Sequence, residues 1–449
     1  MNHDLTLRKP LNTSAEPNWI GIRFLDPVGK VFKRDGYFYR AVYPSQIEHV
    51  QRVLDSSAYR QLVLSRRIVP MEQTTERLDN FGMVLRSKEL PWATYPSEWV
   101  TSSLMRAALL WIDMNQVLST SGYELADAHH ANYKLDDRCL PVWVDFGSIQ
   151  PATRRITALK QFIETQVYPL LCLCSGRKMG RLVRPLLSKG GISRQEFRSI
   201  MPFEPRAHLL DVLCWLNESA DRRFFGAADR RGIIFSLLKR LLLGLRAEPE
   251  KGVWSDYRPL ESVPQAKADP RARVIADLVE ELGPASIMDV GANDGYFSAL
   301  LAARGYKVLA VDSDEYALSK FVRWANDQPD SFAGCAAGCL GNFHDVPHRA
   351  ELVLGLALTH HIALTELYKF DYIAKRFAEM SNEHLITEFM PNGLGSLEMP
   401  DNLPEWYKLE HFLTELGRWW NDVQVVDYKL PLERAPRTLI VCRSKKVHS

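Results

Sequence analysis

The chain has 449 residues, a length typical of roughly two or three domains, and it can bury sizeable cores without disulfides or metal. Apolar residues make up 46% and charged residues 24% of the sequence, a globular composition that excludes wholesale disorder, a collagen-like repeat and a disulfide scaffold. The 56 Lys and Arg residues against 54 Asp and Glu residues leave a net charge of +2, so no strong field attracts nucleic acid or an anionic membrane.

The cysteines and the apolar stretches bear on compartment and metal binding. The N-terminus has no apolar core of signal-peptide length, and no apolar stretch reaches the roughly 18 to 20 residues that cross a bilayer. Cys335 and Cys339 are spaced as a pair, but the sequence has no second pair and no clustered histidines around them, so we expect no metal site. Buried thiols in a reducing compartment are the simpler interpretation, and we expect a cytoplasmic protein.

Residues 1–250 are expected to form an accessory domain of mainly helical α+β character. The pattern over 31–42 predicts a hairpin with Asp35 and Gly36 at its turn, and a helix is expected over 44–64. Further helical patterns cover 102–119, 155–173 and 233–245, and a short strand pair is expected near Tyr133 and at 142–145.

Three polar positions in this half follow an order known from another fold. Asp127, Asn132 and the triplet Asp145-Phe146-Gly147 are similar to the catalytic loop and metal-binding triplet of protein kinases and small-molecule kinases. The resemblance implies that Asp127 would orient a substrate hydroxyl, while Asn132 and Asp145 would hold Mg²⁺ against ATP phosphates.

The departures from the kinase pattern are substantial. No glycine-rich loop precedes the site, and Arg40 follows the hairpin where kinases have lysine, with Glu48 as its obvious acid partner. Leu125 and Ala126 replace the usual His-Arg before the base. We therefore expect a degenerate kinase-like module that binds or presents a substrate, without ATP and Mg²⁺. An unrelated helical accessory domain is the alternative.

A linker over residues 251–270 is expected, because proline and charge cluster there and break helices and strands. Residues 271–449 then alternate strands with helices, which predicts a parallel, doubly wound α/β sheet with one antiparallel strand added at the end. The expected strands are 286–290, 307–311, a weak one near Phe332, 351–358, 384–389, 423–429 and 438–442, and the helices are 272–281, 296–303, 315–326, 367–380 and 403–416.

The most informative stretch is a glycine-containing turn over 287–298. A strand carrying Asp289 passes Gly291 and Gly295 and enters a helix, so the backbone can approach a ligand closely. The spacing differs from that of a dinucleotide-binding loop, and the acid Asp289 disfavours phosphate. The next strand ends in Asp312, which is placed to accept two ribose hydroxyls.

This segment resembles motif I of class I S-adenosylmethionine (SAM) methyltransferases, and Asp312 resembles the ribose-binding acid of that fold. The resemblance implies a Rossmann-like seven-stranded domain with SAM as the cofactor. Asp289 would attract its sulfonium and amino groups. The implied cofactor-binding residues are Asp289, Gly291, Asn293, Gly295, Asp312, Ser313 and Thr359. A turn without a ligand and an NAD site are the alternatives.

Two further strand ends carry the candidate catalytic groups. Thr359-His360-His361 closes the fourth strand, where class I enzymes face the transferred methyl group, and Glu388 closes the fifth. Together they resemble a bacterial family related to nodulation-associated methyltransferases. Because strand residues alternate faces, one histidine of the pair can point into the cleft while the other points away. His360 is the preferred base, since Leu358 two residues earlier should share its face and line the pocket, with His361 and Glu388 next. The alternatives are backbone-capping histidines and a structural Glu388 paired with Arg271 or Arg273.

The sequence thus predicts a SAM-dependent methyltransferase acting on a glycan, a lipid-linked sugar or a small metabolite. A bifunctional kinase-methyltransferase is one alternative. A SAM-binding scaffold without turnover is the other.

Overall fold

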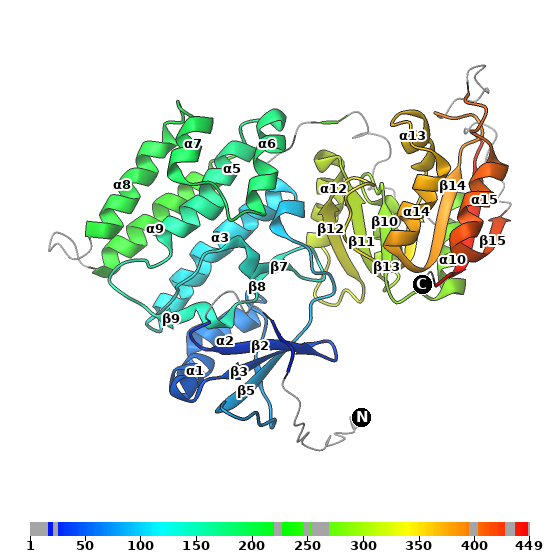
Figure 1. Ribbon diagram of the computed structural model, residues 1–449. Coiled ribbons are helices and arrows are strands. Elements are labelled where there is room, and N and C mark those ends of the chain that lie inside the picture. Colours follow the sequence, from blue (N-terminus) through cyan, green and yellow to red (C-terminus); the bar gives the residue numbers. More distant parts are fainter. Residues whose placement is uncertain are drawn as a thin grey trace. The chain divides into compact units, whose positions relative to one another are not determined.

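The computed structural model describes residues 17–20, 26–219, 227–246, 249, 251–252, 269–394, 403–426 and 436–447. These form two compact units (Figure 1). The first unit takes in the chain up to Ser97, with Ser103–Lys134 and Pro141–Ala247. The second takes in Glu98–Ser102, Leu135–Leu140 and Glu248–Ser449. Most of the expected 251–270 linker lies outside the described residues.

The first unit begins with a five-stranded sheet in the order β1 (Trp19–Ile20), β2 (Gly29–Arg34), β3 (Tyr37–Val42), β5 (Met83–Lys88) and β4 (Glu72–Gln73). The predicted hairpin is confirmed: β2 and β3 pair antiparallel, and Asp35 and Gly36 have φ of 49° and 75° at the turn. The predicted helix 44–64 is interrupted. Helix α1 (Ile47–Asp55) stops at Ser56, whose extended backbone and side chain cap α2 (Ser57–Leu64).

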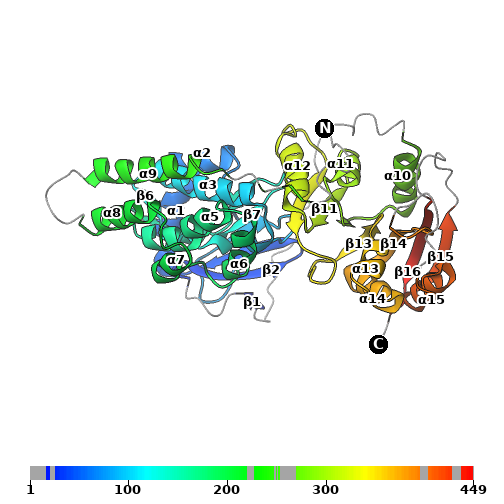
Figure 2. The same ribbon diagram turned by 90° about the horizontal axis from the view of Figure 1, so that it is seen from above.

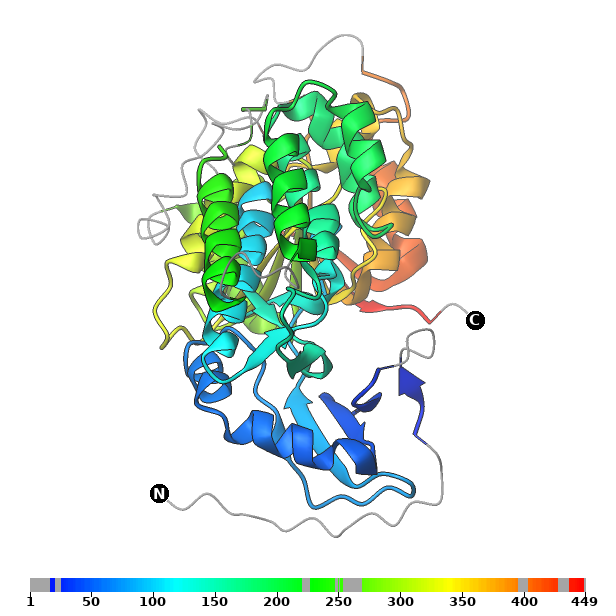
Figure 3. The ribbon, with the colours of Figure 1, turned by 90° about the vertical axis from the view of Figure 1, so that its left-hand side faces the viewer.

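A helical lobe completes the first unit (Figure 3). Its helices are α3 (Thr101–Ser119), α4 (Leu159–Phe162), α5 (Tyr168–Leu173), α6 (Arg177–Leu187), α7 (Arg194–Ile200), α8 (Arg206–Glu218) and α9 (Ala227–Leu243). Short strands β6 (Tyr123–Leu125) and β9 (Ile149–Pro151) pair, as do β7 (Tyr133–Leu135) and β8 (Pro141–Trp143), the latter confirming the predicted strand pair. A small sheet lobe followed by a helical lobe is the arrangement of a kinase-like fold. Helices α6, α7 and α8 were not anticipated.

The second unit is built on a seven-stranded sheet. Its order is β12 (Cys335–Leu340), β11 (Lys307–Asp312), β10 (Ile287–Val290), β13 (Ala350–Gly355), β14 (Ser381–Phe389), β16 (Thr438–Lys445) and β15 (Trp420–Val426). Neighbouring strands run parallel from β12 to β14, and β16 pairs antiparallel with both of its neighbours. The doubly wound sheet with one antiparallel strand is therefore confirmed, and this is the strand order of the class I methyltransferase fold.

Helices cover both faces of this sheet (Figure 2). One face carries α10 (Pro270–Leu282), α11 (Tyr296–Ala302) and α12 (Glu315–Asn326). The other carries α13 (Thr359–Leu364), α14 (Phe370–Met380) and α15 (Leu409–Trp419). The four residues of β10 are all buried, as expected for a central strand covered on both faces.

Three predicted elements of this unit are placed differently. The strand expected near Phe332 begins at Cys335 instead. The strand expected over 351–358 ends at Gly355, because Ala357 takes a φ of 51° and turns the chain into α13. The last expected helix begins at Leu409, and the part of the expected strand 423–429 beyond Val426 lies outside the described residues.

All seven cysteines are free, and Cys139, Cys172, Cys335, Cys339 and Cys442 are buried. No helix in the described part of the chain is both long enough and apolar enough to traverse a bilayer.

Candidate cofactor and acceptor site

The turn after β10 is fixed against the end of β11. The backbone N–H groups of Gly291 and Ala292 both donate to the carbonyl oxygen of Val311, at 2.9 and 3.0 Å. Gly291 has a φ of 74°, and a Cβ there would lie 3.0 Å from Leu358 Cδ1. The absence of a side chain therefore lets the turn lie close to both β11 and Leu358.

A glycine is needed at position 295 for a different physical reason. It caps the start of α11 with a φ of 77°, and a Cβ would approach Phe321 Cδ2 of α12 to 2.5 Å. Such a distance is a clash with a fully buried ring. The second glycine of the motif is thus required for packing α11 against α12, whether or not a ligand is bound.

Asp312 lies beside this turn, and its carboxylate accepts hydrogen bonds from the backbone. Its Oδ2 accepts from the N–H of Asn293 and its Oδ1 from the N–H of Asp314, both at 2.7 Å. A carboxylate offers about four lone-pair sites, and the N–H of Ser313 is a third backbone donor to this one. Burial raises the pKa of Asp312, and the backbone donors oppose that rise. Ser313 is exposed.

Asp289 is a buried acid in the middle of the sheet. Its Oδ2 accepts from Ser298 Oγ of α11 at 2.7 Å. Burial raises its pKa to about 6, the hydrogen bond from Ser298 opposes this, and the charge of Asp312 adds to it. Two neighbouring buried carboxylates with raised pKa values favour a cationic ligand group over phosphate.

The candidate histidines lie on a helix, not at a strand end, so the expectation that they alternate between two faces is wrong. His360 and His361 follow each other in α13 with their ring centroids 4.0 Å apart. His360 Nδ1 is buried and has no hydrogen-bond partner among the described residues. Burial lowers the pKa of His360 to about 3 and also lowers that of His361, so both rings are neutral near pH 7.

Thr359 is fully buried beside the histidines. Its Oγ1 lies 3.3 Å from Thr387 Oγ1, and Thr387 in turn donates to the carbonyl oxygen of Gly355. These contacts join α13 to β14 and β13 and account for Thr359 without a ligand.

Glu388 is held by two cations. Its two oxygens accept from Arg271 Nε and Nη2 at 2.7 and 2.6 Å, and Oε2 also accepts from Arg437 Nη1 and from the N–H of Ala357, at 3.2 and 2.9 Å. This is the structural pairing with Arg271 that the sequence left open. A carboxylate bound by two arginines is a poor proton acceptor, so we do not carry Glu388 forward as a base. Through Ala357 it holds the turn that leads into α13.

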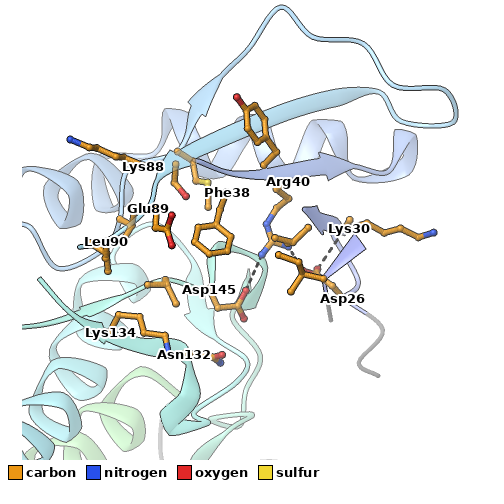
Figure 4. Close-up of a pocket in the computed structure, with 18 of the residues that line it drawn as sticks. Asp26, Lys30, Phe38, Arg40, Lys88, Glu89, Leu90, Asn132, Lys134 and Asp145 are labelled. Carbon is orange, nitrogen blue, oxygen red and sulfur yellow. Dashed lines mark hydrogen bonds and ion pairs between the residues drawn. The ribbon is translucent and has the colours of Figure 1, made fainter. Parts of the chain in front are cut away.

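The first unit contains a cavity of about 740 Å³, and its lining includes Arg40 and two of the kinase-like residues, Asn132 and Asp145 (Figure 4). Arg40, 5% exposed, points between two acids: it pairs with Asp26 and with Asp145, whose Oδ1 is 3.1 Å from Arg40 Nη2. The expected partner Glu48 is instead paired with Arg52 on the same helix. A Cβ at Gly147 would lie 2.7 Å from Arg40 Nη1, so this glycine makes room for the arginine.

The other two kinase-like residues bind each other. Asp127 accepts from Asn132 Nδ2 at 3.0 Å and from the N–H of His129 at 2.7 Å. Asp145 also accepts from the N–H of Gly147, and burial raises its pKa although the charge of Arg40 opposes this. The groups that would hold Mg²⁺ in a kinase are thus engaged with protein partners.

Comparisons with known proteins support the predicted resemblance. The chain is 24% identical over 428 residues to nodulation protein NoeA of Rhizobium meliloti (strain 1021). The matched region covers 85% of this chain and 87% of the relative. No protein-family description matches. Among solved structures, the bifunctional kinase-methyltransferase WbdD matches with 18% identity and a TM-score of 0.30 over 38% of this chain and 39% of its own. Magnesium protoporphyrin IX methyltransferase of Synechocystis PCC 6803 with bound SAM matches with 15% identity and a TM-score of 0.29 over 40% of this chain and 84% of its own.

The first prediction concerns the buried ion pair. Replacing Arg271 by leucine leaves Glu388 buried with fewer donors and should destabilise the second unit by about 3 to 5 kcal/mol in denaturant unfolding. The exposed Arg273, changed to leucine, is the matched control and should cost little. The double variant Arg271→Leu/Glu388→Leu should cost less than the sum of its single variants. Equal effects of Arg271→Leu and Arg273→Leu would contradict the pairing.

The second prediction concerns the cavity of the first unit. Because Arg40 neutralises Asp145 where a metal ion would bind, ATP with Mg²⁺ should give no more thermal stabilisation than ATP alone. Differential scanning fluorimetry of the full chain measures this. A stabilisation that requires Mg²⁺ and disappears in Asp145→Ala would show that the cavity supports kinase chemistry.

Proposed function

We propose that this chain is a SAM-dependent methyltransferase whose cofactor binds at the carboxyl ends of β10 and β11. The observation that carries the proposal is the turn at Gly291. It follows the strand at which the chain order of the sheet reverses, with β11 on one side and β13 on the other. Open α/β sheets bind ligands at such a switch point. Asp312, bound to the N–H of Asn293, lies at the same edge.

The residues present suit SAM better than a dinucleotide. A carboxylate at the position of Asp312 suits the two ribose hydroxyls, and the missing side chain of Gly291 keeps the turn close to β11 and Leu358. Asp289 suits the cationic part, since a nearby positive charge favours its ionised form. When bound, SAM supplies an electrophilic methyl group on a sulfonium. The protein has to exclude water and hold the acceptor in line with that methyl group.

We propose that His360 accepts the proton of the acceptor. Its buried Nδ1 without a protein partner is the observation that favours it over His361. A neutral imidazole is able to accept a proton, and burial, which lowers its pKa to about 3, makes it a weak base. Glu388 and Arg271 act on it indirectly, because they hold the turn at Ala357 from which α13 begins.

For the first unit we propose binding or presentation of the acceptor without phosphotransfer. The pairing of Arg40 with Asp26 and Asp145 supports this over a bifunctional kinase-methyltransferase. A glycan, a lipid-linked sugar and a small metabolite are the acceptor classes that we carry forward. We further propose a cytoplasmic location. A scaffold that binds SAM without turnover is the competing proposal, and release of S-adenosylhomocysteine with an acceptor distinguishes the two.

The third prediction tests the cofactor. Asp312→Ala removes a charged acceptor and should weaken SAM binding roughly tenfold to a hundredfold in calorimetry, and Gly291→Val should weaken it as well because it displaces Leu358. Asp327→Ala, an exposed acid at the other end of α12, is the control. Affinity should also fall as the pH drops below about 6, since Asp289 then becomes protonated and neutral. Unchanged affinity in both variants would overturn the assignment.

The fourth prediction tests the base. His360→Ala should leave SAM affinity nearly intact and lower turnover by about 10² to 10⁴ once an acceptor is known, whereas His361→Ala should have a smaller effect. Initial rates of S-adenosylhomocysteine release measure this. If both variants turn over at the wild-type rate, the histidines are structural and the proton leaves by another route.

A further inference from the structure

Three potential metal ligands of different chemistry meet at the edge of the second unit's sheet. Glu98, Cys339 and His348 each place one ligand atom within 4.8 Å of the other two. All three belong to the second unit, although Glu98 precedes α3 in the sequence. Cys339 lies near the end of β12, the edge strand, and His348 lies in the connection from β12 to β13.

The spacing of two of the ligands already suits a metal ion. His348 Nε2 lies 3.1 and 3.2 Å from the two carboxylate oxygens of Glu98. In a tetrahedral zinc site, bond lengths of about 2.0 to 2.3 Å place nitrogen and oxygen ligands about 3.4 Å apart and sulfur about 3.6 Å from either. The histidine and glutamate therefore need almost no movement, and the thiol, within 4.8 Å of both, needs to close by about 1.2 Å at most.

Burial and charge also fit a divalent cation. Cys339 is 1% exposed, and the side chains of His348 and Glu98 are 11% and 14% exposed. A thiolate and a carboxylate together balance two positive charges, and the neutral imidazole adds none. A hydrogen-bonded His-Glu pair beside a core thiol is the simpler alternative. In that alternative the thiol of Cys339 only donates a weak hydrogen bond to the carbonyl oxygen of Leu340, and its closeness to both partners is incidental.

We propose that Glu98, Cys339 and His348 bind one Zn²⁺ ion, with water as the fourth ligand. Binding releases the thiol proton, and the imidazole proton leaves Nε2 for Nδ1 or for solvent, so no oxidation or reduction occurs. The pairing of Cys335 and Cys339 considered from the sequence is not the pattern used, because only Cys339 has the other two ligands near it.

The site would link two segments of the chain beside the turn at Gly291. Cys339 pairs in register with Val311, the residue that accepts the hydrogen bonds of Gly291 and Ala292. A metal ion at Cys339 and His348 therefore ties the end of the β12–β13 connection to the end of β12, beside the end of β11. Loss of the ion should loosen this connection and lower thermal stability.

Metal content and cobalt spectroscopy of the purified full chain test the proposal. We expect one Zn²⁺ per chain by elemental analysis, and one equivalent of Co²⁺ added to the chelator-treated protein should give the near-ultraviolet absorption of a thiolate–cobalt bond. Cys339→Ser and His348→Ala should each weaken metal binding by about 10- to 100-fold or more. Glu98→Gln keeps a hydrogen bond to His348 but loses the charge, and it should also weaken binding.

Cys335→Ala is the matched control, since it removes another buried thiol from the same strand. It should leave the stoichiometry and the cobalt spectrum unchanged. Circular dichroism shows whether each variant is folded, and only folded variants are compared. The absence of stoichiometric metal, a cobalt spectrum without the thiolate band, or equal loss in Cys335→Ala and Cys339→Ser would overturn the proposal.

Discussion

The hydrogen bonds that the turn after β10 makes to Val311 organise the carboxyl edge of the second unit. Because the N–H groups of Gly291 and Ala292 both reach one carbonyl of β11, the turn cannot move without that strand. The same arrangement brings the N–H of Asn293 to Asp312. The acid and the turn are thus held together before any ligand arrives, which reduces the entropy that binding must overcome.

The buried carboxylate of Glu388 is a second fixed point, and it supports the side of the site formed by α13. Glu388 is fully buried between Arg271 and Arg437, and its contact with the N–H of Ala357 stabilises a backbone conformation at positive φ that a non-glycine residue rarely adopts. That turn sets where α13 begins, and so where His360 lies. The buried ions thus hold the start of α13, and in the proposed function they act on His360 only through that position.

Local patterns predicted much of this. The alternation of strands and helices gave the sheet, and the Asp35-Gly36 hairpin and the Gly291 turn follow from residues adjacent in sequence. Such patterns cannot predict contacts between residues that are far apart in the sequence. Nothing near Arg40 indicates that its partner is Asp26. In the same way, the turn at Ala357 depends on a contact with Glu388, 31 positions away, so the helical position of the histidines could not be anticipated.

The central claim is that SAM binds at the end of β10 beside Asp312, and a crystal structure of the full chain with S-adenosylhomocysteine tests it most directly. The account predicts that the ribose hydroxyls lie on the carboxylate of Asp312 and that the ligand passes over Gly291 toward α13. A ligand bound in the cavity beside Arg40, or a ribose without contact to Asp312, would contradict it.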